Sequence, residues 1–359
     1  DGAWRLGVRK PLKFLETIQL ANPVKGAQYG LRQGIPLSKP LWGLQLDLRL
    51  RNTIGVAVGT AIPAESPQNF LERVRVRGNR KGGGDELTWD VDGAALWRYY
   101  HWYSGTLPQA ASTPALAVAV GTYDIAVTYI IPFPILGTTE ADEVATVMNP
   151  SLFNSLDLEL IIGDGFSIVN GAAAGSTRAL AAFGGGGNPT VDVHTIETMF
   201  GPAANSLRPA VCKRSLPFDL DGNVTLADAF ISNLPVGKAV SRLWFKTGVR
   251  PAAGAGSESP NFSTLSDAII TRAKIKVDGV PVRDALWRAN REYFRTLKGL
   301  EVFPVGYSVI DFCQDGRMSD AFPTFTYGQL GRRFTLEGDT AAGANQRILV
   351  YAEEIISLP

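Results

Sequence analysis

Side chains that commonly carry out catalysis are scarce in this sequence. Its 359 residues include two histidines, His101 and His194, and two cysteines, Cys212 and Cys313. His101 stands in an aromatic run, HWY, and His194 in VDVHTIE, which alternates like a β-strand. Acid–base catalysis by histidine needs a positioned partner. We therefore predict packing or surface roles for the histidines and buried positions for the thiols.

Signatures of the common enzyme classes are absent. The sequence has no GxSxG, HExxH or GxxxxGK[ST] motif, and two histidines are too few for the metal ligands of a two-domain cupin oxygenase. The glycine run FGGGGNP (183–189) lacks the Lys-Ser/Thr pair and the helix that follow a phosphate-binding loop, so a connecting loop is predicted there. We expect no catalytic residue, no metal and no cofactor.

The segment FDLDGNVTLAD (218–228) is the best candidate for a cation site. Counting back from Gly222 at the sixth position of a calcium loop puts Pro217 at the first position, where aspartate is needed, and the closing glutamate is missing. An acidic turn is the simpler interpretation. The oxygen ligands would have been Asp219, Asp221, Asn223 and Asp228.

The composition describes a folded, nearly neutral protein. Hydrophobic residues make up 45% and charged residues 19% of the chain, and 35 basic against 34 acidic residues leave a net charge of +1. Such a balance creates no global field that would recruit nucleic acid or a membrane. The 38 glycines and 22 prolines, about one residue in six, indicate many turns and favour β structure. The length predicts two domains.

Strand signals dominate the chain. Eight segments alternate or are rich in β-forming residues, and Gly, Pro, Asn or Asp bound them, as expected for antiparallel, half-buried strands. We expect no membrane-spanning helix, because the most apolar stretch, 115–137, is interrupted by Asp124, Pro132 and Pro134, and no secretory signal peptide. The predicted strands are 44–52, 73–78, 123–131, 156–164, 271–279, 306–312, 332–339 and 347–355.

One helix is predicted among the strands of each half. In RDALWRANREYFRTL, apolar residues recur at helical spacing and Asp284 stands where a cap would, which predicts a helix over 283–297. A shorter, more aromatic helix is predicted after Asp92. The side chains expected to pack these helices inward are Leu96, Trp97 and Tyr100 in the first, and Leu286, Trp287, Tyr293 and Phe294 in the second.

The two halves also share an ordered series of short matches. Ala-Leu-Trp-Arg occurs at 95–98 and again 190 residues later. Collinear matches indicate an internal repeat with longer insertions in the first copy. We predict an N-terminal arm over 1–24, a first domain over 25–208 and a second over 209–359. The other matches are 35–39 with 234–238 (offset 199), 73–78 with 274–279 (offset 201), and 163–164 with 338–339 (offset 175).

The N-terminal stretch combines cations with apolar side chains, as an interfacial arm does. Two interpretations stay open: an arm on the inner face that touches a membrane, and a basic tail that lies on a partner subunit. Many copies would bind a membrane by avidity even if one arm binds weakly. The residues concerned are Trp4, Arg5, Arg9, Lys10, Lys13 and Phe14.

The pattern of strands, helices and repeat resembles the double jelly-roll major capsid proteins of icosahedral, membrane-containing DNA viruses, in particular the corticovirus-like and tectivirus-like bacteriophages. The resemblance covers nearly the whole chain and rests on ordered pattern, not on a catalytic signature. It is carried by LERVRVRGN, VDGAALWRYYHWYSG, YIIPFPI, NPSLFNSLDLELIIGD, RAKIKVDGVPVRDALW and VIDFCQDGRMS.

The resemblance implies an all-β fold of two tandem eight-stranded jelly rolls, each with one inserted α-helix. It further implies a homotrimeric, pseudo-hexagonal capsomer that tiles an icosahedral shell over an internal lipid membrane. The implied partners are other copies of the chain, penton and minor capsid proteins, and that membrane, with no sequence-specific binding to nucleic acid. The implied location is the capsid shell of the virion, assembled in the host cytoplasm.

Two other functions remain open at this point. A two-jelly-roll glycan-processing enzyme would need acidic residues that converge between the domains. A tandem β-sandwich carbohydrate-binding protein would need the aromatics of YYHWY exposed as a platform. Burial of Trp97, Tyr100 and Trp287 would remove that platform.

Overall fold

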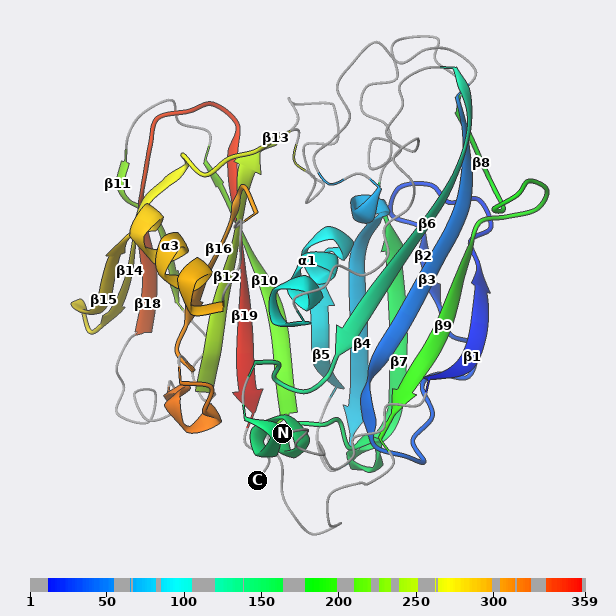
Figure 1. Cartoon of the computed structure of the whole chain (residues 1–359), viewed down its shortest axis with the longest axis horizontal. Helices are drawn as coiled ribbons and strands as arrows, with labels where there is room; N and C mark the ends of the chain where they lie inside the picture. Colours follow the sequence, from blue (N-terminus) through cyan, green and yellow to red (C-terminus); the bar gives the residue numbers. More distant parts are fainter. Residues whose placement is uncertain are drawn as a thin grey trace. The chain divides into compact units, whose positions relative to one another are not determined.

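The computed structural model divides into two compact units (Figure 1). Unit 1 comprises Asp1–Arg208 with Gly254–Asn261, and unit 2 comprises Pro209–Ala253 with Phe262–Pro359. The residues that the structure describes are 12–54, 65, 67–81, 85–104, 120–137, 139–163, 178–198, 210–220, 226–233, 239–250, 262, 264–298, 304–313, 315–323 and 334–356.

Two antiparallel sheets build unit 1. The first has the order β1-β9-β3-β6, and the short strand β8 also pairs with β3. The second includes β2-β7-β4-β5. The bounds are β1 Leu12–Gln19, β2 Gln28–Gly30, β3 Leu41–Ile54, β4 Leu71–Arg80, β5 Asp85–Val91, β6 Gly121–Pro132, β7 Phe153–Ile162, β8 Arg178–Ala181 and β9 Thr190–Glu197.

Alternation along the strands creates the core of unit 1. On β3, Leu44, Leu46, Leu48 and Leu50 are fully buried, while the intervening side chains, from Gln45 onward, point to the other face of the sheet. Helix α1 (Gly93–Ser104) follows β5. Shorter helices are α2 (Glu140–Ala145), and the 3-10 turns η1 (Gln68–Phe70), η3 (Pro150–Leu152) and, in unit 2, η5 (Met318–Asp320).

Unit 2 repeats the same architecture. One sheet includes β10-β19-β12, with β16 and the short strands β13 and β17 also paired to β12, and the other has the order β11-β18-β14-β15. Helix α3 (Trp287–Lys298) follows β15. The strand bounds are β10 Ala210–Leu220, β11 Leu226–Asn233, β12 Ala239–Val249, β13 Thr264–Leu265, β14 Ile270–Val277, β15 Val280–Leu286, β16 Tyr307–Asp311, β17 Phe322–Pro323, β18 Phe334–Thr340 and β19 Gln346–Ile356.

Equivalent strands in the two units pair in the same order. In chain order, β1, β2, β3, β4, β5, β6, β7 and β9 correspond to β10, β11, β12, β14, β15, β16, β18 and β19. Eight antiparallel strands in two packed sheets are the jelly-roll architecture. The predicted all-β fold of two tandem eight-stranded jelly rolls, each with one inserted α-helix, is confirmed. The structure places that helix after the fifth strand of each unit and adds the short helix α2 in unit 1.

The registers fix which residues of the two units are equivalent. Both third strands have a β-bulge in their pairing with the last strand, between Leu41 and Gly43 in β3 and between Val240 and Arg242 in β12, which gives an offset of 199 residues. The bulges in β4 and β14 coincide at the same offset. The offset is 194 from β5 into α1, and 178 for β7 with β18.

Three of the predicted offsets are therefore wrong. The match of 73–78 is displaced by two residues, the Ala-Leu-Trp-Arg match by four and the Gly-Asp match by three. A shift of two returns a strand to the same face, and a shift of four returns a helix to the same side, so the apolar pattern alone could not distinguish these alignments. The order of the repeat was predictable, but its register was not.

The second helix begins later than predicted. Residues 283–286 belong to β15, so Asp284 does not cap the helix but contacts Arg272 on β14. The hairpin between β14 and β15 turns at Asp278 and Gly279, whose φ angles are 51° and 80°. Asp-Gly between alternating segments is a strong hairpin signal, and it sets the strand here. Within the described residues, no helix is long and apolar enough to cross a membrane.

Candidate functional site

His194 lies on β9 among polar neighbours. Its Nδ1 is 3.6 Å from Asp47 Oδ2, and its ring meets the Phe14 ring edge-on at 5.5 Å. Asp47 already accepts hydrogen bonds from Thr128 Oγ1 at 2.6 Å and from Gln45 Nε2 at 2.9 Å. Among the described residues, these contacts bring no nucleophile to the imidazole, so they form a polar sheet face and not a catalytic pair.

Cys313 is a buried, free thiol. Burial raises its pKa to about 12, so the sulfur stays protonated at neutral pH and is not a nucleophile. The backbone N–H of Cys313 donates to Asp311 Oδ1 at 2.9 Å. The side chains of Cys212 and His101 lie outside the described residues.

The described part of the chain contains no group of three or more His, Cys, Asp or Glu that could hold a metal ion. The predicted acidic turn lies between β10 and β11, and its residues 221–225 are outside the described part. The predicted loop at 183–189 turns between β8 and β9, with Gly184–Gly187 all at positive φ and the Gly185 N–H donating to Ala182 O at 2.9 Å.

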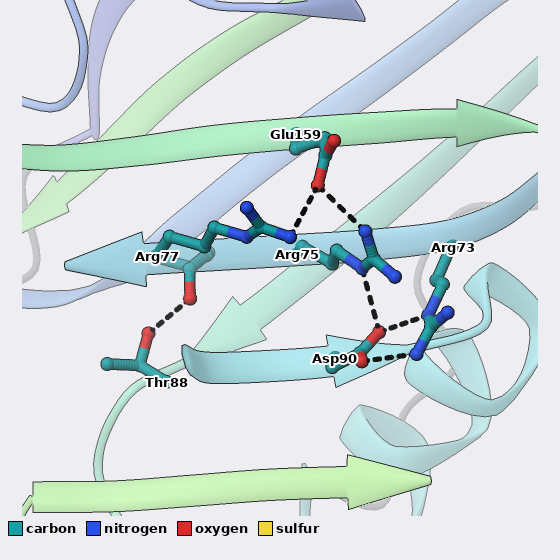
Figure 2. Close-up of polar contacts among 7 residues, drawn as sticks. Arg73, Arg75, Arg77, Thr88, Asp90 and Glu159 are labelled. Atoms are coloured by element: carbon teal, nitrogen blue, oxygen red, sulfur yellow. Dashed lines mark hydrogen bonds and ion pairs between the residues drawn. The ribbon is translucent and has the colours of Figure 1, made fainter. Parts of the chain in front are cut away.

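A row of ion pairs crosses the second sheet of unit 1. Figure 2 shows Arg73, Arg75 and Arg77 along β4, between Asp90 on β5 and Glu159 on β7. Arg73 donates to both oxygens of Asp90 at 2.5 Å. Arg75 bridges the strands, with Nε 3.3 Å from Asp90 and Nη1 3.1 Å from Glu159, and Arg77 lies 3.7 Å from Glu159. Every carboxylate in this row has a cation beside it, so the row joins three strands.

Unit 2 has an equivalent row at the same register. Arg75 corresponds to Lys274, because their Cα partners on the flanking strands are Asp90 and Glu159 in one unit and Asp284 and Glu337 in the other. Lys274 Nζ is 3.0 Å from Asp339 Oδ1. The row also contains contacts of Arg272 with Asp284 and of Lys276 with Glu337.

A second charged cluster, in unit 2, is buried. Arg242 on β12 donates through Nε to Asp311 at 3.0 Å and through Nη1 to Glu353 at 2.8 Å, and all three side chains are almost inaccessible to solvent. Ser241 Oγ donates to the same Glu353 oxygen at 2.6 Å. Sequence reasoning missed this cluster. The available signal was an arginine inside the mostly apolar strand AVSRLWFKTGV.

The predicted packing residues of the first helix lie inside unit 1. Leu96 and Trp97 are buried, and Tyr100 is half-buried with its ring 6.4 Å from Trp42. Burial, and secondarily the charge of Glu143, raises the pKa of the Tyr100 hydroxyl.

Of the four side chains predicted to pack inward from the second helix, two are buried and two are exposed. Trp287 and Phe294 are buried, and Trp287 packs edge-on against Phe245 at 5.1 Å. The prediction that Leu286 and Tyr293 pack inward is wrong, because they are 65% and 49% exposed. Leu286 ends β15, and Tyr293 points away from the side of α3 that buries Phe294. Trp97 and Trp287 are buried, so these two side chains offer no platform for a sugar.

The described part of the predicted arm is a strand. Lys13 and Phe14 lie on β1, which pairs along its length with β9, and Lys13 Nζ is 3.8 Å from Glu197. Both side chains remain exposed, Phe14 by 56%. Trp4, Arg5, Arg9 and Lys10 lie outside the described residues.

Comparisons with known proteins extend this picture. The model of the family described as viral coat protein P2 C-terminal domain matches residues 215–355, from within β10 to within β19. No curated protein sequence matches the chain.

Solved structures resemble the whole chain. The major capsid protein of Sulfolobus turreted icosahedral virus matches with a TM-score of 0.63 at 14% identity, over 96% of each chain. The major capsid protein P2 of bacteriophage PM2 gives 0.56 at 13% identity, over 97% of this chain and 98% of that one. The capsid of the virus PBCV-1 gives 0.55 at 14% identity, over 97% and 95%.

The second jelly roll thus matches a coat-protein family, and the chain as a whole has the fold of viral major capsid proteins. The ion-pair rows hold strands together and, among the described residues, bring no reactive groups to one place. Residues 215–355 thus resemble a viral coat-protein domain, and the fold of the chain is similar to that of double jelly-roll major capsid proteins.

Proposed function

We propose that three copies of this chain form a pseudo-hexagonal capsomer that tiles an icosahedral shell. The observation that carries the proposal is the internal equivalence of the two jelly rolls, down to the bulges of their third and fourth strands. Three copies of a chain with two similar units present six similar units around one axis. A tile with six similar edges packs into a hexagonal lattice.

Charge supports dense packing of identical subunits. A net charge of +1 on 359 residues creates little repulsion between neighbouring copies. The proposed partners are other copies of the chain, penton and minor capsid proteins at special positions of the shell, and an internal membrane.

The test of the capsomer is its mass in solution, by light scattering at low and moderate salt, together with electron microscopy. The expected particle is a trimer near three times 38.6 kDa with a hexagonal outline. A clean monomer at micromolar concentration would overturn the proposal. A glycan-processing or carbohydrate-binding function is not favoured, because Trp97 and Trp287 are buried and the described residues show no catalytic arrangement.

The membrane contact is proposed for the residues before β1. The basic residues Arg5, Arg9 and Lys10 stand among apolar ones such as Trp4, a combination that suits the interface of an anionic bilayer. Lys13 and Phe14 were predicted as part of this arm, and their place on β1 leaves them at its base.

Flotation of trimers with vesicles of phosphatidylglycerol and phosphatidylethanolamine tests the arm. Arg5→Gln, Arg9→Gln and Lys10→Gln together are expected to abolish flotation. A matched control replaces three exposed cations elsewhere, Lys25, Arg32 and Arg317, with glutamine and is expected to float like the wild type. Equal flotation of both variants would refute the membrane role of the arm and leave the capsomer untouched.

A further inference from the structure

The two inserted helices differ sharply in exposure. At the offset of 194 residues, Tyr99 on α1 corresponds to Tyr293 on α3, yet Tyr99 is 0% exposed and Tyr293 is 49% exposed. Ala94 is buried, whereas its counterpart Arg288 is exposed. The strand before each helix follows the same rule, since the described side chains of β5 are buried and most of those on β15 are exposed. The inserted helix and the strand before it are thus buried in unit 1 and largely exposed in unit 2.

The sheet that contains the third strand shows the opposite asymmetry. On the face of this sheet away from the core, Trp244, Lys246 and Tyr351 of unit 2 are buried. Their counterparts in unit 1, at offsets of 199 for β3 and 157 for β9, are Gln45, Asp47 and His194, and each is partly exposed. This face is thus covered in unit 2 and open in unit 1.

We infer that these two open surfaces bind each other between copies of the chain, head to tail. The helix surface consists of Val280, Val282, Leu286, Arg288 and Tyr293 on β15 and α3. The sheet surface consists of Phe14, Gln45, Asp47, Arg49, Asp192 and His194 on β1, β3 and β9. The inference rests on the proposed capsomer and names the surfaces that close it.

The chemistry of the two surfaces is complementary. Leu286 and Tyr293 supply apolar area opposite a face that carries Phe14. Arg288 is a cation, and Asp47 and Asp192 place two carboxylates on the sheet surface. Aromatic and arginine side chains are the residue types enriched where interfaces are energetically important.

A second copy can cover the sheet surface without leaving the polar groups of that surface unsatisfied. Asp192 accepts a hydrogen bond from Thr17 Oγ1 at 2.6 Å, and Asp47 accepts one from Thr128 Oγ1 at the same distance. Carboxylates that already have partners lose less on desolvation than unpartnered ones. The equivalent face of unit 2 is buried while it carries Lys246, so this face tolerates burial of charge.

The contact joins unlike surfaces, and each chain has one of each. A heterologous contact of this kind closes into a ring when its rotation divides a full turn. Three copies then leave neither surface open, which a two-fold contact between two helix surfaces would not achieve.

Mixing two defective variants tests the head-to-tail arrangement. One variant carries Leu286→Glu and Tyr293→Glu on the helix surface. The other carries Phe14→Asn, Asp47→Asn and Asp192→Asn on the sheet surface, which removes the aromatic ring and both carboxylates. Each alone is expected to lose the trimer. Their mixture keeps one intact surface from each partner and is expected to form a one-to-one dimer in native mass spectrometry. The control, Val24→Glu with Val120→Glu, changes two other exposed valines and is expected to remain trimeric.

Two results would overturn the inference: a helix-surface variant that remains trimeric, or a mixture of folded variants that stays monomeric. Circular dichroism of each variant reports whether it has folded.

A labelling experiment avoids the need for defective variants. Ala289 is exposed on α3 between the residues of the helix surface, and Lys25 is exposed near β2. In trimers, maleimide is expected to label Lys25→Cys and to lose access to Ala289→Cys. Equal labelling in a verified trimer would refute the inference and leave the capsomer standing. A wild-type chain that is monomeric would instead overturn the capsomer, and the inference with it.

Discussion

Replacing Arg242 with methionine is expected to destabilise unit 2 more than any exchange of a surface arginine. The guanidinium lies in a solvent-free site and contacts two buried carboxylates, Asp311 at 3.0 Å and Glu353 at 2.8 Å. Methionine fills similar volume but removes the positive charge. Two carboxylates then share an apolar site without their cation, which is the costly way to break a buried ion pair.

The expected loss is large on the scale of a domain's stability. Removing one member of a buried ion pair costs about 3–5 kcal/mol. At about 3 °C per kcal/mol for a domain of this size, the melting temperature of unit 2 falls by about 10 °C or more. The combined variant Arg242→Met, Asp311→Asn and Glu353→Gln removes all three charges, and we expect it to recover most of the loss.

The assay is thermal unfolding at one fixed protein concentration, since assembly shifts apparent stability by mass action. The matched control is Arg272→Met, which breaks a half-exposed pair with Asp284 in the same unit and is expected to cost about 0–1 kcal/mol. An Arg242→Met melting temperature no lower than that of Arg272→Met would refute the reasoning. So would a triple variant less stable than the single one.

Three further outcomes follow from local contacts. Arg51 donates to both oxygens of Asp124 and holds the pKa of that carboxyl below its ordinary 3.8. The stabilisation from this pair is therefore present above pH 3.8 and is lost as the pH falls through the lowered pKa. Arg51→Met should raise the Asp124 pKa in an NMR titration, and an unchanged value would contradict the assignment. At Gly78, an added Cβ would lie 2.3 Å from the Phe153 ring, so Gly78→Ala should cost about 1–3 kcal/mol in urea unfolding and Phe153→Leu should relieve that loss. A neutral Gly78→Ala would contradict this and show that the Phe153 ring moves aside without cost. Cys313 should resist iodoacetamide at pH 8 in the folded protein and react in urea, with the site located by mass spectrometry; rapid labelling of the native chain would disprove its burial.

The β-rich architecture was predictable because its strands alternate cleanly. The leucines of β3 occupy every second position, and one face of that sheet is core. A strict period of two leaves only one way to bury such a strand, so the sheet follows from the pattern. The same holds for the order of the repeat, which the collinear sequence matches indicate by themselves.

The register and the exposure of the helices were not predictable in the same way. Leu286 and Tyr293 fit the helical spacing. The hairpin at Asp278 and Gly279 pairs β15 with β14, however, so Leu286 is the last residue of a strand, and Tyr293 points away from the core. The buried Arg242 was equally hidden, because its partners Asp311 and Glu353 are distant in sequence. Pairings of this kind depend on which strands meet, and a single sequence does not encode that locally.

The turn at Gly184–Gly187 places an unusual limit on variation. All four residues have φ between 78° and 97°, a region that costs other L-residues about 1–2 kcal/mol each. At Gly184 and Gly186 a Cβ would meet no neighbouring atom, so backbone conformation alone, and no contact, excludes other residues. Exposed loops usually drift in sequence with little penalty. This loop is exposed yet restricted to glycine, which makes it a poor place to insert a foreign peptide for display and a stable epitope for an antibody meant to recognise diverged variants of this protein.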